Sequence, residues 1–261
     1  MYATERQESI ALALESSGRV SVTQLAAEFD VTAETVRRDL DQLETAGLLR
    51  RVHGGAVSAS RGSVTEVAVG QRRAEHHDAK SAIVDVAMRM LPPTFGGSIL
   101  LDAGTTTALL AERLAAWTPA DGQQLTVITN SVQNLQSLDA NPHLDLHLLG
   151  GRLRGITGAL VGAGTVAQLA ALRPDISFIG TNGLSAGFGL STPDELEGAV
   201  KAAMVQYSRR AVVLADATKL AQEALVRFAG LDEIDTLVTD ARPGADLLAA
   251  LEAADVEVLA A

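Results

Sequence analysis

The chain has 261 residues, of which 47% are hydrophobic and none is cysteine. This length favours two domains over one, and the lack of cysteine excludes disulfide frameworks, thiolate catalysis and cysteine-based metal sites. The formal net charge of -11 argues against a protein that coats nucleic acid through bulk positive charge, because such binding rests on the neutralisation of phosphates.

The start of the sequence, MYATERQESI, lacks the basic and then apolar pattern of a signal peptide. No apolar run approaches the ~18 residues that would suggest a membrane span. We therefore expect a cytoplasmic protein that has no membrane partner.

Two short helices are predicted near the N-terminus. Residues 5 to 16 place apolar side chains among Glu and Arg, and Gly18 follows where such a helix would stop. Ser21 with Gln24 three residues later is the pattern of a capping box, which predicts that a second helix opens there and runs to Phe29.

A third helix is predicted to follow Thr32, whose side chain can cap it. One face of this helix is apolar and consists of Val36, Leu40 and Leu43, at positions i, i+4 and i+7. Thr35, Arg37 and Arg38 lie off that face. A helix in the major groove presents such residues to base edges and flanking phosphates, so we interpret this segment as a recognition helix.

The next residues predict a β-hairpin wing. Residues 48–57, LLRRVHGGAV, are predicted to form two short strands around the turn at Gly54 and Gly55, and Arg50 and Arg51 lie on the first strand. Residues 37 to 61 hold five Arg against three Asp or Glu, a local charge of +2 in an acidic chain. Paired arginines and a Gly-Gly turn are each common on ordinary surfaces, but their order and spacing together favour a winged helix-turn-helix that binds DNA.

A change of composition marks the boundary of this domain. Residues 58–65, SASRGSVT, are small and polar and predict a flexible joint. We expect a winged helix-turn-helix at 1–57, a linker at 58–75 and an α/β domain at 76–261. His76 and His77 could suggest a metal site, but adjacent side chains point apart and no cluster follows at ligand spacing. We interpret them as a solvated helix start and predict no metal or cofactor.

Beyond residue 97, apolar runs of strand length alternate with helical stretches. The candidate strands are 98–101, 125–128, 144–149, 176–179, 211–215, 236–238 and 256–259. Nearly continuous apolar strands separated by helices indicate a mainly parallel sheet with helices on both faces. In such sheets ligands bind outside the carboxyl ends of the strands, so the polar residues there are the candidates for a binding site.

The first of these strands is followed by Asp102 and then by Gly104, Thr105, Thr106 and Thr107, which lead into a helix. Glycine lets the backbone approach an anion, the N–H groups at the helix start can point at it, and three hydroxyls add donors. This turn predicts a phosphate cradle, although Gly-Thr turns also occur as plain helix caps.

Four further strand ends carry small, polar or charged residues. The candidates there are Thr129, Asn130 and Ser131, then Gly151, then Asn182, and finally Asp216 and Lys219. Asp216 could hold a sugar hydroxyl and Lys219 a phosphate. A surface salt bridge is the alternative interpretation of this pair.

Two sets of motifs resemble the DeoR family of bacterial regulators. The run SVTQLAAEFDVTAETVRRDLDQLETAGLLRRVHGGAV is similar to its helix-turn-helix signature, and GTTT, TNS, GG, D-x-x-K and a final I-D-x-x-x-T-D are similar to its effector domain. The resemblance spans nearly the whole chain. It implies a sensor domain with a ribose-5-phosphate-isomerase-like fold, a phosphorylated sugar or sugar alcohol as ligand, and repression that the ligand relieves.

Together with the patterns above, the resemblance assigns residues to two sites. The DNA-binding residues would be Ser21, Thr32, Glu34, Thr35, Arg37, Arg38, Arg50, Arg51, His53 and Gly54. The effector-binding residues would be Asp102, Gly104, Thr105, Thr106, Thr107, Thr129, Asn130, Ser131, Gly151, Asn182, Asp216 and Lys219. A single helix reads too few base pairs to select one site in a genome, so we expect a homo-oligomer on double-stranded operator DNA.

Two other functions are open at this point. An isomerase with an accessory DNA-binding module needs a base and a group that polarises the carbonyl oxygen, and Asp216 and Lys219 could serve. However, residues 179–183 hold no Asp or Glu where isomerases resembling this fold carry a carboxylate-rich loop. An architectural DNA-binding protein would not need the polar strand ends. We therefore favour a ligand-responsive regulator over an enzyme, and the sequence leaves the identity of its sugar phosphate open.

Overall fold

In the computed structural model, the chain divides into two compact units, Met1–Thr65 and Glu66–Ala261. The structure describes residues 3–17, 19–52, 54–58, 72–73, 75–120 and 122–261. Of the helices in this described part, none is long and apolar enough to cross a lipid bilayer.

Helices of the first unit pack around a small apolar core. They are α1 (Ala3–Ser17), α2 (Val22–Glu28) and α3 (Ala33–Thr45). The predicted apolar face of α3 lies in this core, where Val36 and Leu40 are buried with Ile10 of α1 and Leu25 of α2. As predicted, Thr32 caps α3, because its side chain accepts a hydrogen bond of 3.2 Å from the backbone N–H of Thr35.

A three-stranded antiparallel sheet in the order β1-β3-β2 completes the unit. Its strands are β1 (Arg19–Ser21), β2 (Leu49–Val52) and β3 (Gly55–Ser58). β2 and β3 form the predicted hairpin, and Gly54 in its turn has a φ of +79°, a conformation that favours glycine. The sequence patterns do not predict β1. Ser21 pairs with Gly55 of β3 and makes no side-chain hydrogen bond to α2, so the predicted capping box is wrong.

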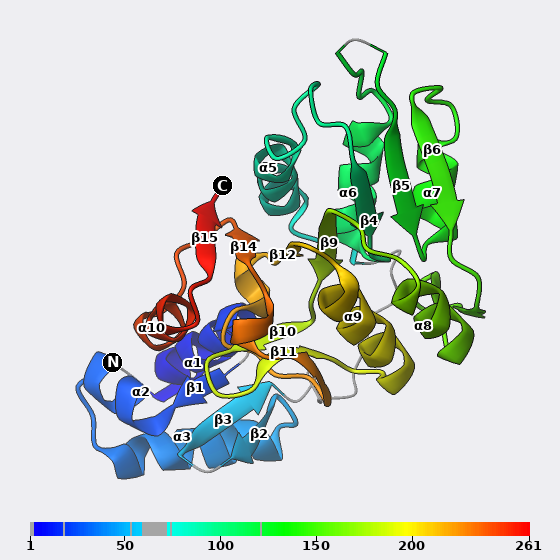
Figure 1. Cartoon of the computed structure of the whole chain (residues 1–261). Coiled ribbons are helices and arrows are strands. Elements are labelled where there is room, and N and C mark those ends of the chain that lie inside the picture. Colours follow the sequence, from blue (N-terminus) through cyan, green and yellow to red (C-terminus); the bar gives the residue numbers. More distant parts are fainter. Residues whose placement is uncertain (1–2, 18, 53, 59–71, 74, 121) are drawn as a thin grey trace. The chain divides into compact units, whose positions relative to one another are not determined.

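The second unit is built on a seven-stranded parallel sheet (Figure 1). Its strands in chain order are β4 (Ser98–Leu101), β5 (Leu125–Thr129), β6 (Leu144–Leu148), β9 (Ile176–Gly180), β12 (Ala211–Leu214), β14 (Thr236–Thr239) and β15 (Glu257–Ala260). Each agrees with a predicted strand to within one residue at either end. All neighbouring strands run parallel, which confirms the predicted α/β fold with a mainly parallel sheet.

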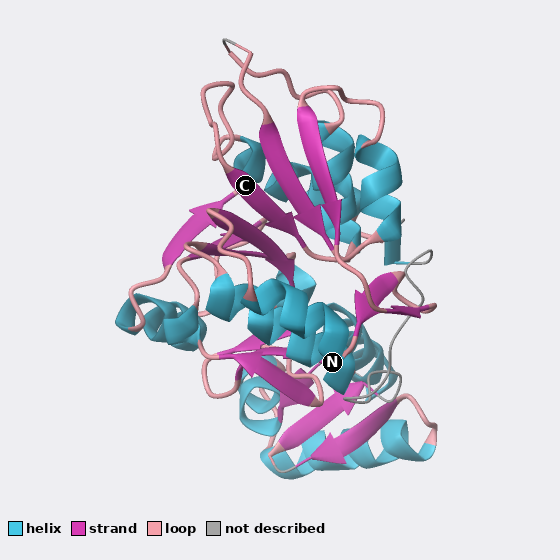
Figure 2. Ribbon diagram, turned by 45° about the vertical axis from the view of Figure 1, so that its right-hand side comes forward, coloured by secondary structure: helices cyan, strands magenta, loops and turns pink. Residues whose placement is uncertain are grey.

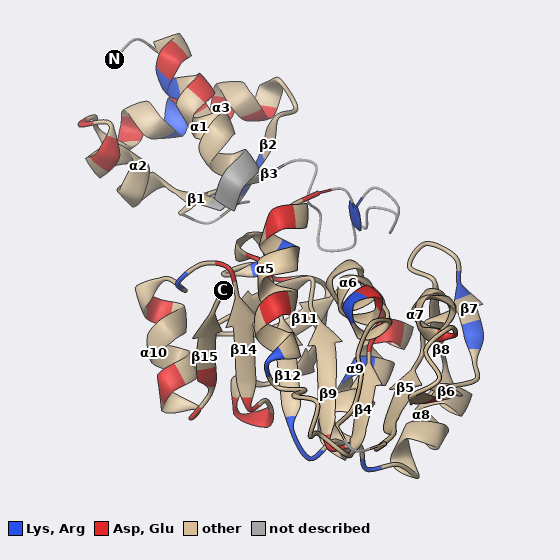
Figure 3. Cartoon of the chain, turned by 90° about the horizontal axis from the view of Figure 1, so that it is seen from above, with Lys and Arg blue, Asp and Glu red and all other residues tan. Residues whose placement is uncertain are grey.

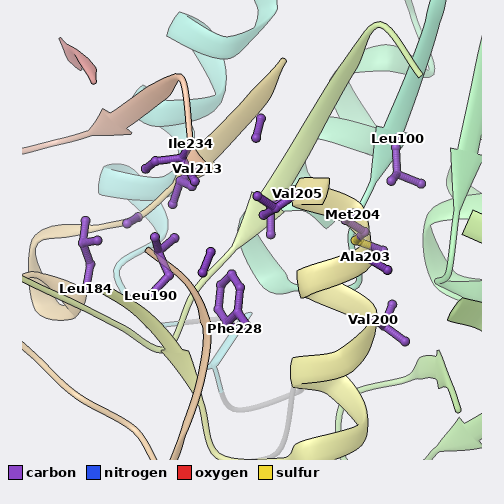
Figure 4. Close-up of a cluster of buried hydrophobic side chains, with 14 of the residues drawn as sticks. Leu100, Leu184, Leu190, Val200, Ala203, Met204, Val205, Val213, Phe228 and Ile234 are labelled. Carbon is purple, nitrogen blue, oxygen red and sulfur yellow. The ribbon is translucent and has the colours of Figure 1, made fainter. Parts of the chain in front are cut away.

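Helices cover both faces of this sheet (Figure 2). One apolar core includes α5 (His77–Met88), α6 (Thr105–Leu114) and α7 (Val132–Leu138), and the other includes α8 (Ala163–Ala170), α9 (Glu195–Tyr207) and α10 (Ala245–Ala253). Successive strand residues alternate between the cores, so Leu100 lies in the α9 core while Leu101 lies in the α6 core. Figure 4 shows Val200, Met204 and Phe228 in the α9 core. Burial of both faces explains why the strands are apolar at nearly every position.

Shorter strands among the described residues lie outside the parallel sheet. β10 (Gly183–Ser185), β11 (Gly189–Thr192) and β13 (Val226–Ala229) form an antiparallel sheet, and β7 (Arg152–Arg154) and β8 (Ala159–Val161) form a hairpin. The sequence patterns do not predict them. Each has three or four residues, which is too short for an alternation of polar and apolar residues to stand out.

The strand order β15-β14-β12-β9-β4-β5-β6 reverses between β4 and β9. The chain first adds β5 and β6 on one side of β4, and later adds β9 and the remaining strands on the other side. α6 follows β4 on one face of the sheet, and α9 lies beyond β9 on the other face. In parallel sheets such a reversal opens a crevice at the carboxyl ends of the two strands, where ligands bind.

Candidate functional site

α3, the helix predicted to be the recognition helix, exposes most of its predicted DNA-binding residues. Thr32, Glu34, Arg37 and Arg38 are exposed, and Thr35 is half-buried. Arg37 Nη1 lies 3.3 Å from Glu34 Oε2, and no described residue forms an ion pair with Arg38. Because an exposed ion pair contributes little to stability, both arginines are able to reach a DNA phosphate or base.

Asp39, the next residue of α3, is buried instead. Its carboxylate accepts hydrogen bonds from Arg6 of α1, of 2.5 Å from Nε to Oδ2 and 3.1 Å from Nη2 to Oδ1. Both side chains are more than nine-tenths buried, and the hydrogen bonds from Asp39 raise the pKa of Arg6 above its usual range. The pair joins α3 to α1 and so sets the orientation in which α3 presents its exposed arginines. Sequence reasoning missed it, because no pattern links residues so far apart.

The two wing arginines have different surroundings. Arg50 is exposed, as is Gly54 in the hairpin turn. Arg51 forms an ion pair with Asp41 of α3, and its backbone N–H donates a 2.8 Å hydrogen bond to Glu44, so it helps to hold β2 against α3. His53 lies outside the described residues.

In the second unit, a cavity that opens to solvent lies at the carboxyl ends of β4 and β9, where the strand order reverses. Its walls also include the turn after β12, parts of α5 and α9, and residues just before α5. The structure therefore brings together several predicted effector-binding residues from three strand ends. These are Gly104, Thr105, Thr106, Thr107, Asn182, Asp216 and Lys219.

α6 begins at this cavity. Its first hydrogen bond runs from the N–H of Ala108 to the C=O of Gly104, at 2.9 Å, so the N–H groups of the three threonines before it have no partner within the helix. Thr107 Oγ1 donates to the C=O of Gly104 at 3.1 Å, and the hydroxyls of Thr105 and Thr106 form no hydrogen bond with other described residues. Free donors and the positive end of the helix dipole favour an anion here.

Lysines are concentrated in this cavity. The chain contains 18 arginines but three lysines, and Lys80, Lys201 and Lys219 all line it. Lys80 is buried, and its ammonium donates to the C=O groups of Arg72 and Glu75. Burial lowers the pKa of Lys80, and the charge of Asp216 opposes this shift. The cavity thus combines compact positive charges with the helix start.

Lys201, in the wall of the cavity, forms a buried pair with Asp102. The Lys201 ammonium contacts Asp102 Oδ2 and donates to the C=O of Gly180 at 2.8 Å, while the N–H of Gly180 donates to Asp102 Oδ2 at 3.1 Å. Burial raises the pKa of Asp102, and the charge of Lys201 opposes the rise. Asp102 is not among the residues that line the cavity; it links the ends of β4 and β9.

Four further predicted effector residues have structural contacts away from the cavity lining. Asn130 Oδ1 accepts from the N–H of Ala103 at 2.9 Å, and Thr129 Oγ1 donates to the C=O of Leu101 at 2.8 Å. Ser131 caps α7, and a Cβ atom at Gly151 would lie 2.2 Å from Thr165 Oγ1. Thr129 and Asn130 thus hold the end of β4 and the turn after it, and none of the four residues lines the cavity.

Sequence reasoning missed Thr157, Glu197 and Lys201, which line the cavity from the β7–β8 turn and from α9. The one signal was a pair of opposite charges four residues apart in a largely apolar helix, a pattern that usually marks a surface ion pair. Glu197 supplies a carboxylate that residues 179–183 lack.

Comparisons with known proteins identify the family. Residues 6–62 match the DeoR-like helix-turn-helix domain, and residues 75–241 match the DeoR C terminal sensor domain. The chain is 37% identical over 260 residues to the HTH-type transcriptional regulator GlpR of Haloferax volcanii. The aligned region covers 99% of this chain and 98% of that protein. It is 31% identical to the glycerol-3-phosphate regulon repressor of Haemophilus influenzae, over 90% of this chain and 88% of that protein.

Among solved structures, ribose 5-phosphate isomerase A from Methanocaldococcus jannaschii is 18% identical, with a TM-score of 0.40, over 56% of this chain and 55% of that chain. The two domain matches together span most of the sequence and agree with the motifs that predicted them. The chain therefore belongs to the DeoR family, whose members are DNA-binding transcriptional regulators rather than enzymes.

Proposed function

We propose that this protein is a repressor that leaves its operator when the cavity of the second unit binds a phosphorylated sugar or sugar alcohol. The observation that carries this proposal is the presence of all three lysines of the chain, together with the start of α6, around one cavity. Phosphate is recognised by such ammonium groups and by helix N-termini. Asn182, Asp216 and Glu197 supply acceptors for hydroxyl groups in the same cavity.

The relatives support this class of effector. The Haemophilus influenzae protein that is 31% identical to this chain is named for glycerol 3-phosphate, a phosphorylated polyol. The ligand must bind one arrangement of the domains better than the other, because a ligand with equal affinity for both shifts no equilibrium.

For DNA, we propose contacts from Thr32, Thr35, Arg37 and Arg38 of the recognition helix and from Arg50 of the wing. The DNA-binding domain would occupy residues 1–57 and the sensor domain residues 76–261, joined by a linker. A homo-oligomer in the cytoplasm would place two recognition helices on repeated half-sites, since one helix reads few base pairs.

The experiment that tests this function measures binding of the protein to its own upstream DNA at fixed salt, titrated with a panel of sugar phosphates. Release of the DNA by one compound is the expected result. Binding that responds to salt concentration but to no compound would instead indicate an architectural DNA-binding protein. Saturable isomerisation of a sugar phosphate that depends on Asp216 would favour an enzyme.

Replacement of Arg38 by Ala is expected to weaken operator binding by about 1–3 kcal/mol, because an arginine contact to a base edge contributes about that much. Affinity for the effector should stay unchanged, and fluorescence anisotropy of labelled operator DNA measures the difference. Arg89→Ala, which removes an exposed arginine at the end of α5, is the matched control. Loss of operator and effector binding together in Arg38→Ala would contradict separate sites.

A further inference from the structure

The geometry points to Glu197 as the residue that selects the effector: it accepts a hydrogen bond from a hydroxyl of the ligand and rejects ligands that carry a carboxylate at that position. This inference rests on the proposed function of the cavity as a phosphate-binding site. It narrows the effector to a phosphorylated polyol or sugar and excludes phosphorylated sugar acids.

Glu197 is held in place from two directions. Asp194 caps α9 and accepts hydrogen bonds of 3.0 Å from the N–H groups of both Leu196 and Glu197. From the β7–β8 hairpin, Arg154 lies 3.2 Å from Glu197 Oε1 and 3.2 Å from Asp194 Oδ2, and the hydroxyl of Thr157 donates to Glu197 Oε1. The blue colour of β7 in Figure 3 marks its arginines. The carboxylate is therefore fixed before any ligand arrives.

The second carboxylate oxygen of Glu197 has no such partner. Both side-chain contacts go to Oε1, and no described residue donates a hydrogen bond to Oε2. The side chain is 7% exposed and lines the cavity. Oε2 is not among the buried polar atoms that lack a partner, so it is open to the cavity, and a ligand hydroxyl is able to donate to it.

The charges around Glu197 disfavour a negative ligand group, because the one arginine in contact with it, Arg154, is shared with the carboxylate of Asp194. The nearby ammonium of Lys201 is engaged by Asp102 and by the C=O of Gly180. Burial chiefly raises the pKa of Asp102, and the negative charge of Glu197 adds to that rise. A ligand carboxylate beside Oε2 would bring a further negative charge and no proton to donate.

Matched pairs of probes test this selection. Glycerol 3-phosphate has a hydroxymethyl group where 3-phosphoglycerate has a carboxylate. Glucose 6-phosphate has an aldehyde, or a hydroxyl in its ring form, where 6-phosphogluconate has a carboxylate. Calorimetric titration of the full-length protein with the pair that binds should give a preference for the uncharged member of about tenfold or more. Inorganic phosphate serves as the reference ligand, because it tests only the part of the cavity formed by the start of α6 and the lysines.

Glu197→Gln keeps the size of the side chain and should reduce the preference to less than about threefold, while affinity for inorganic phosphate stays unchanged. Thr157→Val removes one of the two donors that hold Oε1 and should also reduce the preference. This variant replaces Glu197→Gln if Glu197→Gln does not fold. Glu195→Gln is the matched control, since Glu195 lies on the same helix and is exposed; it should keep the wild-type preference.

The outcomes separate this inference from the function on which it rests. One set of results would contradict the role of Glu197 but leave the phosphate cavity in place. In that case the probes bind with an affinity that depends on Lys219, but the preference persists in Glu197→Gln and Thr157→Val, or the wild type prefers the acid. If neither a probe nor inorganic phosphate binds in a manner that Lys219→Ala weakens, the proposed effector cavity itself is wrong.

Discussion

Replacement of Lys219 by Ala is expected to leave operator binding intact while raising the effector concentration needed to release DNA by about 10- to 150-fold. Lys219 lines the cavity beside the start of α6, and loss of one hydrogen bond to a charged group costs about 1.5–3 kcal/mol. Thr106→Val removes a neutral hydroxyl at the same helix start and should raise that concentration by about fivefold. Anisotropy of labelled operator DNA, titrated with the releasing compound, measures both variants.

Arg242→Ala provides the control for these two variants, because Arg242 is an exposed cation of the same unit and does not line the cavity. It should respond to the effector as the wild type does. Normal release of DNA in both Lys219→Ala and Thr106→Val would remove this cavity from the mechanism. Loss of operator binding by either variant would show an effect on the fold instead.

Replacement of Asp39 by Ala is expected to destabilise the first unit by about 3–5 kcal/mol, because it leaves the guanidinium of Arg6 buried without its carboxylate partner. Natural domains have a total stability of about 5–15 kcal/mol, so this unit would be partly or wholly unfolded and operator binding would fall with it. Urea unfolding followed by far-ultraviolet circular dichroism should show an early transition that the wild type lacks.

The single tryptophan allows the two units to be followed separately. Trp117 is buried in the second unit, where its Nε1 donates to the C=O of Leu91 at 3.1 Å, so its fluorescence should keep the wild-type transition in Asp39→Ala. Asp41→Ala breaks the ion pair with Arg51, whose partners are 33% and 55% exposed, and should cost at most about 1 kcal/mol. Equal losses of stability in the two variants would contradict the importance of the buried pair.

Several parts of this structure could be predicted from local patterns. Spacing of four and seven residues placed Val36, Leu40 and Leu43 on the buried face of α3, and continuous apolar runs located all seven strands of the parallel sheet. Such patterns are local because burial repeats with the period of the element itself. They also located the turn at Gly104 to Thr107, since a helix start exposes N–H groups wherever it occurs.

The composition of the cavity depended on tertiary structure. Thr129 and Asn130 lie at the end of a strand, as Gly104 does, yet their side chains form hydrogen bonds with backbone groups of Leu101 and Ala103, because buried polar atoms need a partner. Glu197 and Lys201 reach the cavity because the sheet reverses between β4 and β9 and brings α9 to that edge. A sequence marks which residues lie at strand ends, but only the packed fold decides which of them face a ligand and which support the wall behind it.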